Sequence, residues 1–218
     1  TVREGAAWLT TLRKTQALLT QPLVVPESVE IASERYPGKN RCGDFASVIS
    51  TPRGCAVLLV DGGGHGVTGL AQAHAIETAL RTALSEFPAT TLDPARVFES
   101  LNRMVAASPG RQTVACTYVG LDINARKLAY INAGGASPLL MLEPGRTVTA
   151  EQTSLVLGVD KGYRYETAVL DLPASFRLVL FSDGVIDATN VEGEVLGEKR
   201  LRETLESPTG FAAATQIA

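Results

Sequence analysis

The chain has 218 residues and a mass of 23.0 kDa, which is enough to bury one sizeable core, and its composition does not require a second domain. Its 20 basic and 23 acidic residues give a net charge of −3, too even a balance to favour nucleic acid or a membrane surface as the main partner. Cys42, Cys55 and Cys116 stand apart without a CxxC pair, and no apolar run approaches the roughly 20 residues of a membrane span. We therefore expect a cytoplasmic protein with no membrane span.

The first segment, residues 1–22, predicts a connector helix. Trp8, Leu12 and Leu19 fall on one helical face, and the pattern stops at Pro22. Two interpretations remain open: the helix packs on its own domain, or it joins the domain to a partner subunit or an upstream sensor. Residues 23–218 form the predicted single domain.

From residue 28 onward, short segments rich in β-branched residues alternate with Pro or Gly turns, as in antiparallel hairpins. Apolar residues at helical spacing then predict two helices, over residues 73–87 and 97–105, the second capped by Asp93 and opened by Pro94. Strand patterns resume after residue 111, and "EKRLRETLE" closes the pattern as a helix. This order predicts an α+β fold with two stacked antiparallel β-sheets flanked by helices.

One glycine-rich loop admits a nucleotide interpretation. In "AVLLVDGGGHGVTGLAQAHAI", Gly64, Gly66 and Gly69 match G-x-G-x-x-G between a strand and a helix. However, "PATTLDPARV" after this helix is too polar for the buried parallel strand that a dinucleotide site needs, and no Lys follows Gly69 as a P-loop requires. A dinucleotide binder therefore remains the weaker alternative.

Acidic residues at strand ends favour a metal site instead. Asp44 begins one apolar strand, and Asp61 and Asp183 end two others. Each alone is better explained as a turn or cap residue, but three buried carboxylates together need a compensating cation, and Mg²⁺ or Mn²⁺ prefers such all-oxygen ligands. Gly62 and Gly184 permit tight turns that bring backbone carbonyls near an ion.

Several segments together resemble the PPM-type metal-dependent protein serine/threonine phosphatases, in their bacterial RsbU-like and SpoIIE-like branch. "RCGDFASVI" is similar to its GGDFYDV box, "LVDGGGHGVTG" to its D-x-S-G-H-G box, and "YINAGGASPLLML" to its NAGHNPPLL strand pair. "LVLGV" and "LFSDGVIDATNVEGEVLGEKRL" resemble its PLGV and YTDGVTEARNPEGELFGEERL segments. The last match is long and ordered, and hence the most specific.

The resemblance implies a dinuclear Mn²⁺ or Mg²⁺ centre at one end of the stacked sheets. In it, Asp44 matches the first acidic ligand, Asp61 the ligand that bridges both metals, and Gly62 a backbone-carbonyl ligand. Asp183 matches the acid of the [ST]-D-G motif, and Asp187 takes a place that in some relatives touches a third, weaker metal.

The chain departs from the family pattern in three places. Ser47 stands where RsbU-like enzymes carry a second acid, and Gly135 and Ala136 replace the His and Asn of AGHN. The D-D-x-T strand, which carries the last ligand aspartate, has no counterpart before Ala218. We therefore expect a domain without its last strand and a centre one carboxylate short.

The resemblance implies hydrolysis of phosphoserine or phosphothreonine by a metal-bridged water. The substrate would be a STAS-type anti-anti-sigma protein or a similar regulator in bacterial sigma-factor control of stress or development. His65 is either the general acid for the leaving oxygen or a loop residue that caps the helix. The alternative function is a non-catalytic, phosphatase-like module that binds a regulatory partner.

Overall fold

The computed structural model describes residues 29, 31, 45–62, 67–108, 113–143, 146–151 and 154–206. The predicted connector helix of residues 1–22, Asp44 and His65 lie outside these residues. No helix in the described part of the chain is long and apolar enough to cross a membrane.

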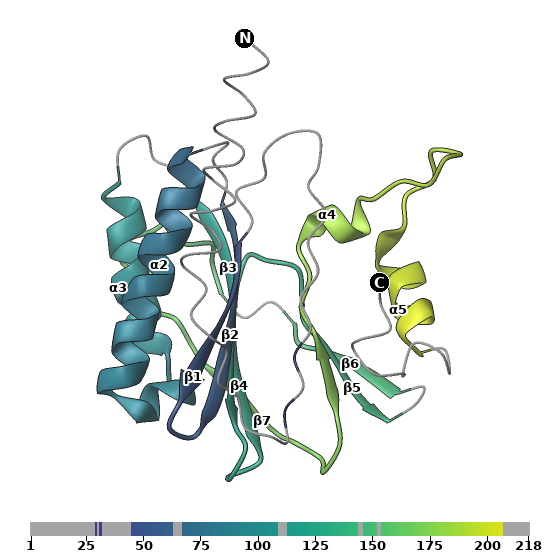
Figure 1. Ribbon diagram of the computed structural model, residues 1–218. Helices are drawn as coiled ribbons and strands as arrows, with labels where there is room; N and C mark the ends of the chain where they lie inside the picture. The colour runs from purple at the N-terminus through teal and green to yellow at the C-terminus, as the bar shows by residue number, and fades with distance from the viewer. Residues whose placement is uncertain are drawn as a thin grey trace, which may run out of the picture.

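Eight described strands form two antiparallel sheets (Figure 1). The larger sheet has the order β1-β2-β3-β4-β7, and the smaller one the order β6-β5-β8. The strands of the larger sheet are β1 (Phe45–Thr51), β2 (Gly54–Gly62), β3 (Val114–Asp122), β4 (Lys127–Ala133) and β7 (Ala168–Asp171); those of the smaller sheet are β5 (Leu139–Glu143), β6 (Arg146–Thr149) and β8 (Arg177–Val179).

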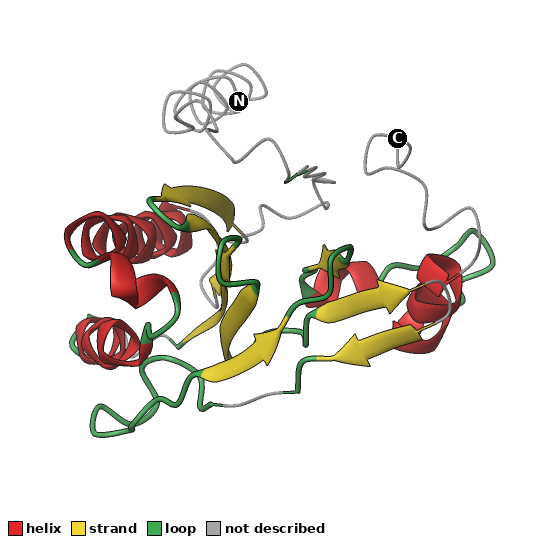
Figure 2. Ribbon diagram, turned by 90° about the horizontal axis from the view of Figure 1, so that it is seen from below, coloured by secondary structure: helices red, strands yellow, loops and turns green. Residues whose placement is uncertain are grey.

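Helices cover the outer face of each sheet. In Figures 1 and 2 one helical group lies beyond the larger sheet and another beyond the smaller sheet, with the strands between them. The first group is α2 (Val67–Glu86), the 3₁₀ helix η1 (Pro88–Thr91) and α3 (Ala95–Ala106); the second is α4 (Asp183–Ile186) and α5 (Gly197–Glu206).

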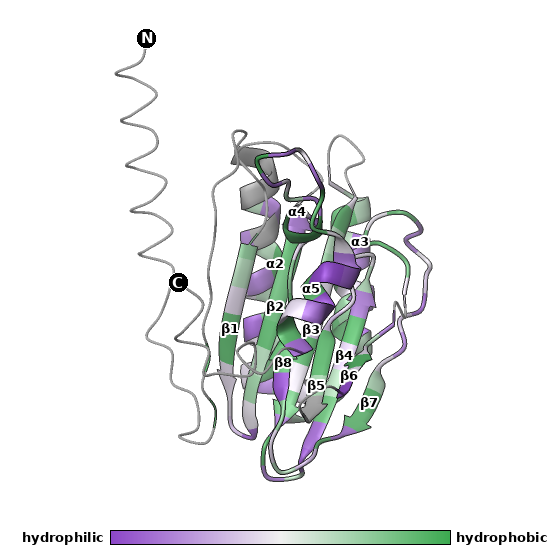
Figure 3. Cartoon of the chain, turned by 90° about the vertical axis from the view of Figure 1, so that its right-hand side faces the viewer, coloured by the Kyte–Doolittle hydropathy of each residue, from purple (hydrophilic) through white to green (hydrophobic). Residues whose placement is uncertain are grey.

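Strand alternation explains this layering. Successive side chains of a strand point to opposite faces, so Leu58 and Val60 of β2 pack with Ile76 and Leu80 of α2, whereas Cys55 faces the smaller sheet. Figure 3 accordingly shows the central strands mainly in hydrophobic colours and α5 mainly in hydrophilic ones. Strands of the larger sheet are apolar on both faces because both faces are covered.

Two further clusters complete the stack. Val119, Leu121 and Leu128 of the larger sheet meet Leu140 and Leu178 of the smaller sheet between the two layers. On the outer face of the smaller sheet, the neighbours of Leu140 along β5 pack against α5 and the segment before α4; this cluster contains Leu139, Met141, Phe181 and Leu205. The predicted α+β fold of two stacked antiparallel sheets flanked by helices is confirmed.

The structure corrects some details of the predicted elements. β6 was not predicted as a separate strand, and β8 covers only the start of the apolar segment "RLVLF" because its pairing with β5 spans only Arg177 to Val179. The prediction that Asp93 caps α3 is wrong: Pro94 takes the capping position, and no side chain there makes a capping hydrogen bond.

The segment after α2 also decides against a dinucleotide site. It forms η1 and α3 rather than a strand, and the described strands pair antiparallel throughout both sheets. A dinucleotide site requires a parallel βαβ unit, so the glycine-rich loop serves a different purpose.

Candidate active site

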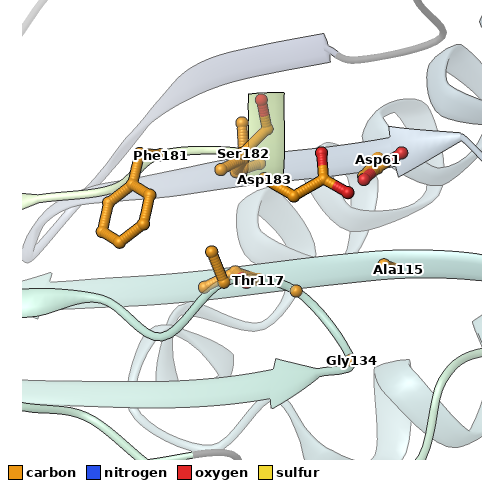
Figure 4. Close-up of a pocket in the computed structure, with 10 residues that line it drawn as sticks. Asp61, Ala115, Thr117, Gly134, Phe181, Ser182 and Asp183 are labelled. Carbon is orange, nitrogen blue, oxygen red and sulfur yellow. The ribbon is translucent and has the colours of Figure 1, made fainter. Parts of the chain in front are cut away.

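A small cavity lies between the two sheets, where β2 ends and α4 begins (Figure 4). Its volume of about 50 Å³ has room for one or two water molecules. The wall from the larger sheet consists of Leu59, Asp61, Ala115 and Thr117; the loop after β4 adds Gly134, Gly135 and Ala136; the opposite wall consists of Phe181, Ser182 and Asp183.

Asp61 reaches the cavity because of its position in β2. It pairs with Ala115 of β3, and Leu59 pairs with Thr117, so all four side chains lie on the face turned toward the smaller sheet. Asp61 is half-buried near the end of β2, which lies between β1 and β3 in the sheet. The strand thus presents a carboxylate at the end of an apolar surface.

Asp183 approaches from the other layer. It is the first residue of the four-residue helix α4, and the preceding Ser182 is extended. Figure 4 shows the Asp183 carboxylate directed toward Asp61 across the cavity. Two carboxylates more than a hundred residues apart in sequence therefore line one space, although Asp183 is exposed and Asp61 only partly so.

A hydrogen-bonded turn forms the floor of the cavity. Asn132 accepts the Gly135 N–H at 2.9 Å through Oδ1 and donates from Nδ2 to the Gly135 carbonyl at 3.1 Å, which fixes the orientation of its amide. Thr117 donates its hydroxyl to the same Oδ1 at 3.2 Å. Asn132 and Thr117 are both buried and pair across β3 and β4.

This turn explains why a glycine stands at residue 135, where the family pattern has His. A Cβ at Gly135 would lie 2.5 Å from Thr117 Oγ1, and a Cβ at Gly134 would lie 2.1 Å from Val156 Cγ2. Gly134 also has a φ of +84°, a conformation that favours glycine. A larger side chain at either position would require its neighbour to move.

Sequence reasoning missed the Thr117–Asn132 pair. Nothing in the local pattern distinguishes a buried Thr or Asn from an ordinary strand residue. Their partnership depends on the register of β3 against β4, which only the fold supplies.

The predicted ligand residues have different outcomes. Asp61 and Asp183 line the same cavity, and Gly62 ends β2 directly beside Asp61. Asp187 is exposed and does not line the cavity; it lies one turn beyond Asp183, whose carbonyl accepts its N–H at 2.9 Å. Ser47 does not line the cavity either and instead bonds to Glu77 of α2.

The cavity fits a divalent cation in donor type but not in donor number. Its two carboxylates are the hard oxygen ligands that Mg²⁺ and Mn²⁺ prefer. Within the described ranges, however, no cluster of three or more His, Cys, Asp or Glu side chains is arranged to hold a metal. A complete site would need further ligands, and Asp44, which matches the first acidic ligand of the family, lies outside those ranges.

Two stacked antiparallel sheets, helices on both outer faces and an acid pair between the sheets define an αββα sandwich of the kind seen in PP2C domains. The structure resembles the SiaA-PP2C domain of Pseudomonas aeruginosa with a TM-score of 0.64 at 21% identity, over 76% of this chain and 65% of that chain. It also resembles the RsbU and RsbW domains of Rv1364c from Mycobacterium tuberculosis, with a TM-score of 0.63 at 23% identity, over 76% of this chain and 47% of that one. At these identities the likeness establishes the fold.

The family model named Stage II sporulation protein E (SpoIIE) matches residues 51–217, and the chain belongs to this family. Among curated proteins, it is similar to the phosphoserine phosphatase RsbU of Bacillus subtilis, with 24% identity over 180 residues that cover 82% of this chain and 52% of RsbU. It is also similar to the phosphoserine phosphatase RsbP of B. subtilis, with 23% identity over 78% of this chain and 43% of RsbP. The chain thus spans about half the length of these relatives.

Proposed function

We propose that the protein is a Mn²⁺- or Mg²⁺-dependent protein serine/threonine phosphatase. The observation that carries this proposal is the convergence of Asp61 and Asp183, from different layers of the fold, on one cavity. A cation between two carboxylates that face each other would relieve their mutual repulsion. Family membership supports the same assignment, since RsbU and RsbP are named phosphoserine phosphatases.

The proposed ligands are Asp44, Asp61, Asp183 and the Gly62 carbonyl, which together would hold two ions, with Asp187 near a third and weaker one. The described pairing of β1 with β2 ends at Phe45 and Val60, one residue short of a pair between Asp44 and Asp61. The proposal requires this pairing to continue by one residue, because Asp44 would then share the face on which Asp61 lies.

The reaction would use water rather than a side chain as nucleophile. Two ions held there would make a shared water acidic near neutral pH and neutralise the phosphoryl oxygens. Asp61 and Asp183 orient the reacting groups, while Leu59 and Phe181 limit the entry of bulk water. His65, in the loop after Gly62, would protonate the leaving serine or threonine oxygen.

The two cysteines in the described part of the chain do not support cysteine chemistry as an alternative. Cys55 and Cys116 are both fully buried. Burial raises the pKa of the Cys55 thiol to about 11, and it raises the pKa of Cys116 further still. Because the thiolate is the reactive form, neither side chain is a nucleophile at neutral pH.

The proposed substrate is a phosphorylated regulatory protein of the STAS or anti-anti-sigma type, in the cytoplasm. Similarity to the phosphoserine phosphatases RsbU and RsbP supports a protein substrate, and the net charge of −3 does not favour nucleic acid. We further propose that residues 1–22 connect the phosphatase domain of residues 23–218 to an upstream sensor or to a second copy.

Hydrolysis of an aryl phosphate and of a phosphoserine peptide tests the proposal. We expect turnover that requires Mn²⁺ or Mg²⁺, stops on addition of chelator and is lost in Asp61→Asn. The matched control is Asp160→Asn, because Asp160 is an exposed acid that does not line the cavity. Turnover that persists in chelator would contradict the proposal.

A second candidate function is a non-catalytic module that binds a phosphoprotein or regulatory partner. One observation favours it: the described part of the cavity carries only two acids and has Gly135 and Ala136 in place of the family's His and Asn. Such a module should give no binding heat on titration with Mn²⁺ yet should still bind a partner, whereas the enzyme must bind the metal.

A further inference from the structure

A buried acid on α2 lies outside the cavity and has no part in the proposed chemistry. Glu77 is only 7% exposed, although glutamate is seldom buried without a partner. Its Oε1 accepts the Ser47 hydroxyl at 2.5 Å and Arg81 Nη2 at 2.9 Å. Its Oε2 lies 3.5 Å from His74 Nδ1. We call the group Ser47, His74, Glu77 and Arg81 the α2 clamp.

The contacts of the clamp keep Glu77 ionised. Burial alone would raise the pKa of Glu77, but the hydrogen bonds from Ser47 and Arg81 outweigh it and hold the pKa below its usual value. A buried carboxylate whose partners are removed is strongly destabilised. Ser47 and Arg81 are therefore needed wherever Glu77 stays buried and charged.

The clamp joins two particular segments. Ser47 lies on β1, an edge strand of the described sheet, and Glu77 lies thirty residues later on α2, which packs along β1 and β2. A second contact runs parallel to it, since the rings of Phe45 and His74 meet edge to face at 4.8 Å.

These two contacts follow one another along the strand and the helix. Phe45 and Ser47 are two residues apart on a strand, a rise of about 6.6 Å. His74 and Glu77 are three residues apart on one helical face, a rise of about 4.5 Å. Together the two contacts fix the position of α2 along β1.

The position of α2 along β1 matters for the cavity. β1 begins one residue after Asp44, and α2 begins five residues after the β2 end at Gly62. A slide of α2 along β1 would therefore pull on the short connection that follows Asp61 and Gly62. The clamp is a polar contact between α2, which follows this connection, and β1, the strand that pairs with β2 before it.

We propose that Glu77 is a positioning residue for the metal site, and that the Ser47–Glu77 bond fixes α2 so that the ends of β1 and β2 present their ligands together. This inference rests on the proposed function, because it requires a bound metal. It also gives a reason for Ser47: an acid at residue 47 would lie against the Glu77 carboxylate and repel it, so the chain carries the acid on α2 instead.

Isothermal titration with Mn²⁺ tests this inference without reliance on turnover. We expect Glu77→Gln to weaken Mn²⁺ affinity about 10- to 100-fold, the usual cost of losing a residue that supports metal ligands. Ser47→Asp should weaken affinity to a similar extent through like-charge repulsion. The double variant Ser47→Asp with Glu77→Ser should recover most of the loss because it returns one acid to the pair.

The matched control is Asp122→Asn. Asp122 is also fully buried, contacts Arg53 and accepts the Ala125 N–H at 2.8 Å, but it lies at the far end of β3 from the cavity. We expect this variant to lower the melting temperature and leave Mn²⁺ affinity unchanged. Should Glu77→Gln fail to fold, Ser47→Ala removes a single bond of the clamp and should still weaken affinity.

The outcomes separate the two proposals. Equal Mn²⁺ affinity in wild type and the folded clamp variants would overturn the positioning role alone, as would an equal loss in Asp122→Asn. Absence of Mn²⁺ binding in the wild type would overturn the proposed function and the positioning role with it.

Discussion

The two walls of the cavity are built differently. Asp61 is the penultimate residue of a nine-residue strand that pairs with a neighbour on each side and is covered on both faces. Asp183 begins a helix of four residues, none of them buried, that follows a strand of three residues. The larger sheet supplies a rigid wall, and the smaller sheet supplies an exposed one.

This difference indicates how the two acids divide their roles. A carboxylate on a strand locked between two neighbours keeps its position with or without a ligand, whereas one on a short exposed turn is held mainly by what it binds. We expect the rigid wall to set the position of the ions and the exposed wall to respond to them.

The largest expected effect on activity comes from replacing each of the two acids, one at a time, by asparagine. Asp61→Asn should reduce metal-dependent aryl phosphate hydrolysis by more than about 100-fold, beyond the usual cost of losing a residue that merely supports a ligand. Asp183→Asn should lower it less, with more of the loss recovered at high Mn²⁺ concentration. Steady-state rates over a Mn²⁺ series measure both. A greater loss in Asp183→Asn would reverse the assignment of the two walls.

The floor between the walls provides the next test. Gly134→Ala should cost about 2–5 kcal/mol in the free energy of unfolding, because the new Cβ meets Val156 and the backbone has positive φ. Gly193→Ala is the matched control, since Gly193 has a φ of +82° but no heavy atom within 4 Å. It should cost only about 1–2 kcal/mol. Equal costs by urea denaturation would contradict the packed floor.

A pH series sharpens the comparison on the helix side of the larger sheet. The pKa of Glu77 is lowered from its ordinary 4.5 in the folded protein, so its contribution to stability is present above that value and is lost as the pH falls through the lower folded value. We expect Glu77→Gln to cost about 1.5–3 kcal/mol at pH 7. The difference from wild type should shrink below about pH 4. A difference that stays constant down to pH 3 would show that the charge of Glu77 is not what matters.

The smallest effect is expected in the interior of the larger sheet. Burial raises the pKa of the Cys55 and Cys116 thiols, so alkylation of the native protein at pH 8 should leave both unmodified while urea-unfolded protein reacts at both. Peptide mass mapping distinguishes the two sites. Rapid modification of either in the native state would show that this wall opens.

The fold could be predicted well because its signals are local. Apolar alternation and turn residues identified β1 to β5 and α5, and the Asp-Gly steps after apolar strands identified Asp61 and Asp183. β6 was not predicted because its four residues, "RTVT", are polar at alternate positions and directly follow a turn-like segment. The prediction that Asp93 caps α3 was wrong because a favourable capping residue next to Pro94 did not decide where the helix starts.

The parts of the site that could not be predicted are those that depend on register. Thr117 meets Asn132 because β3 and β4 pair at those positions, and Ser47 meets Glu77 across thirty residues because α2 packs along β1. Neither residue type indicates its partner locally. The small residues at Gly135 and Ala136 were noticed only as departures from a pattern, and the steric reason for Gly135 required the structure.

The central claim is that Asp61 and Asp183 bind the same ions. A double-mutant cycle on Mn²⁺ affinity tests it most directly. If the two acids share ions, the double variant Asp61→Asn with Asp183→Asn should bind little more weakly than the poorer single variant, since ligands of one ion act as a unit. Losses that simply add, or a wild-type protein that gives no Mn²⁺ binding heat, would contradict the account.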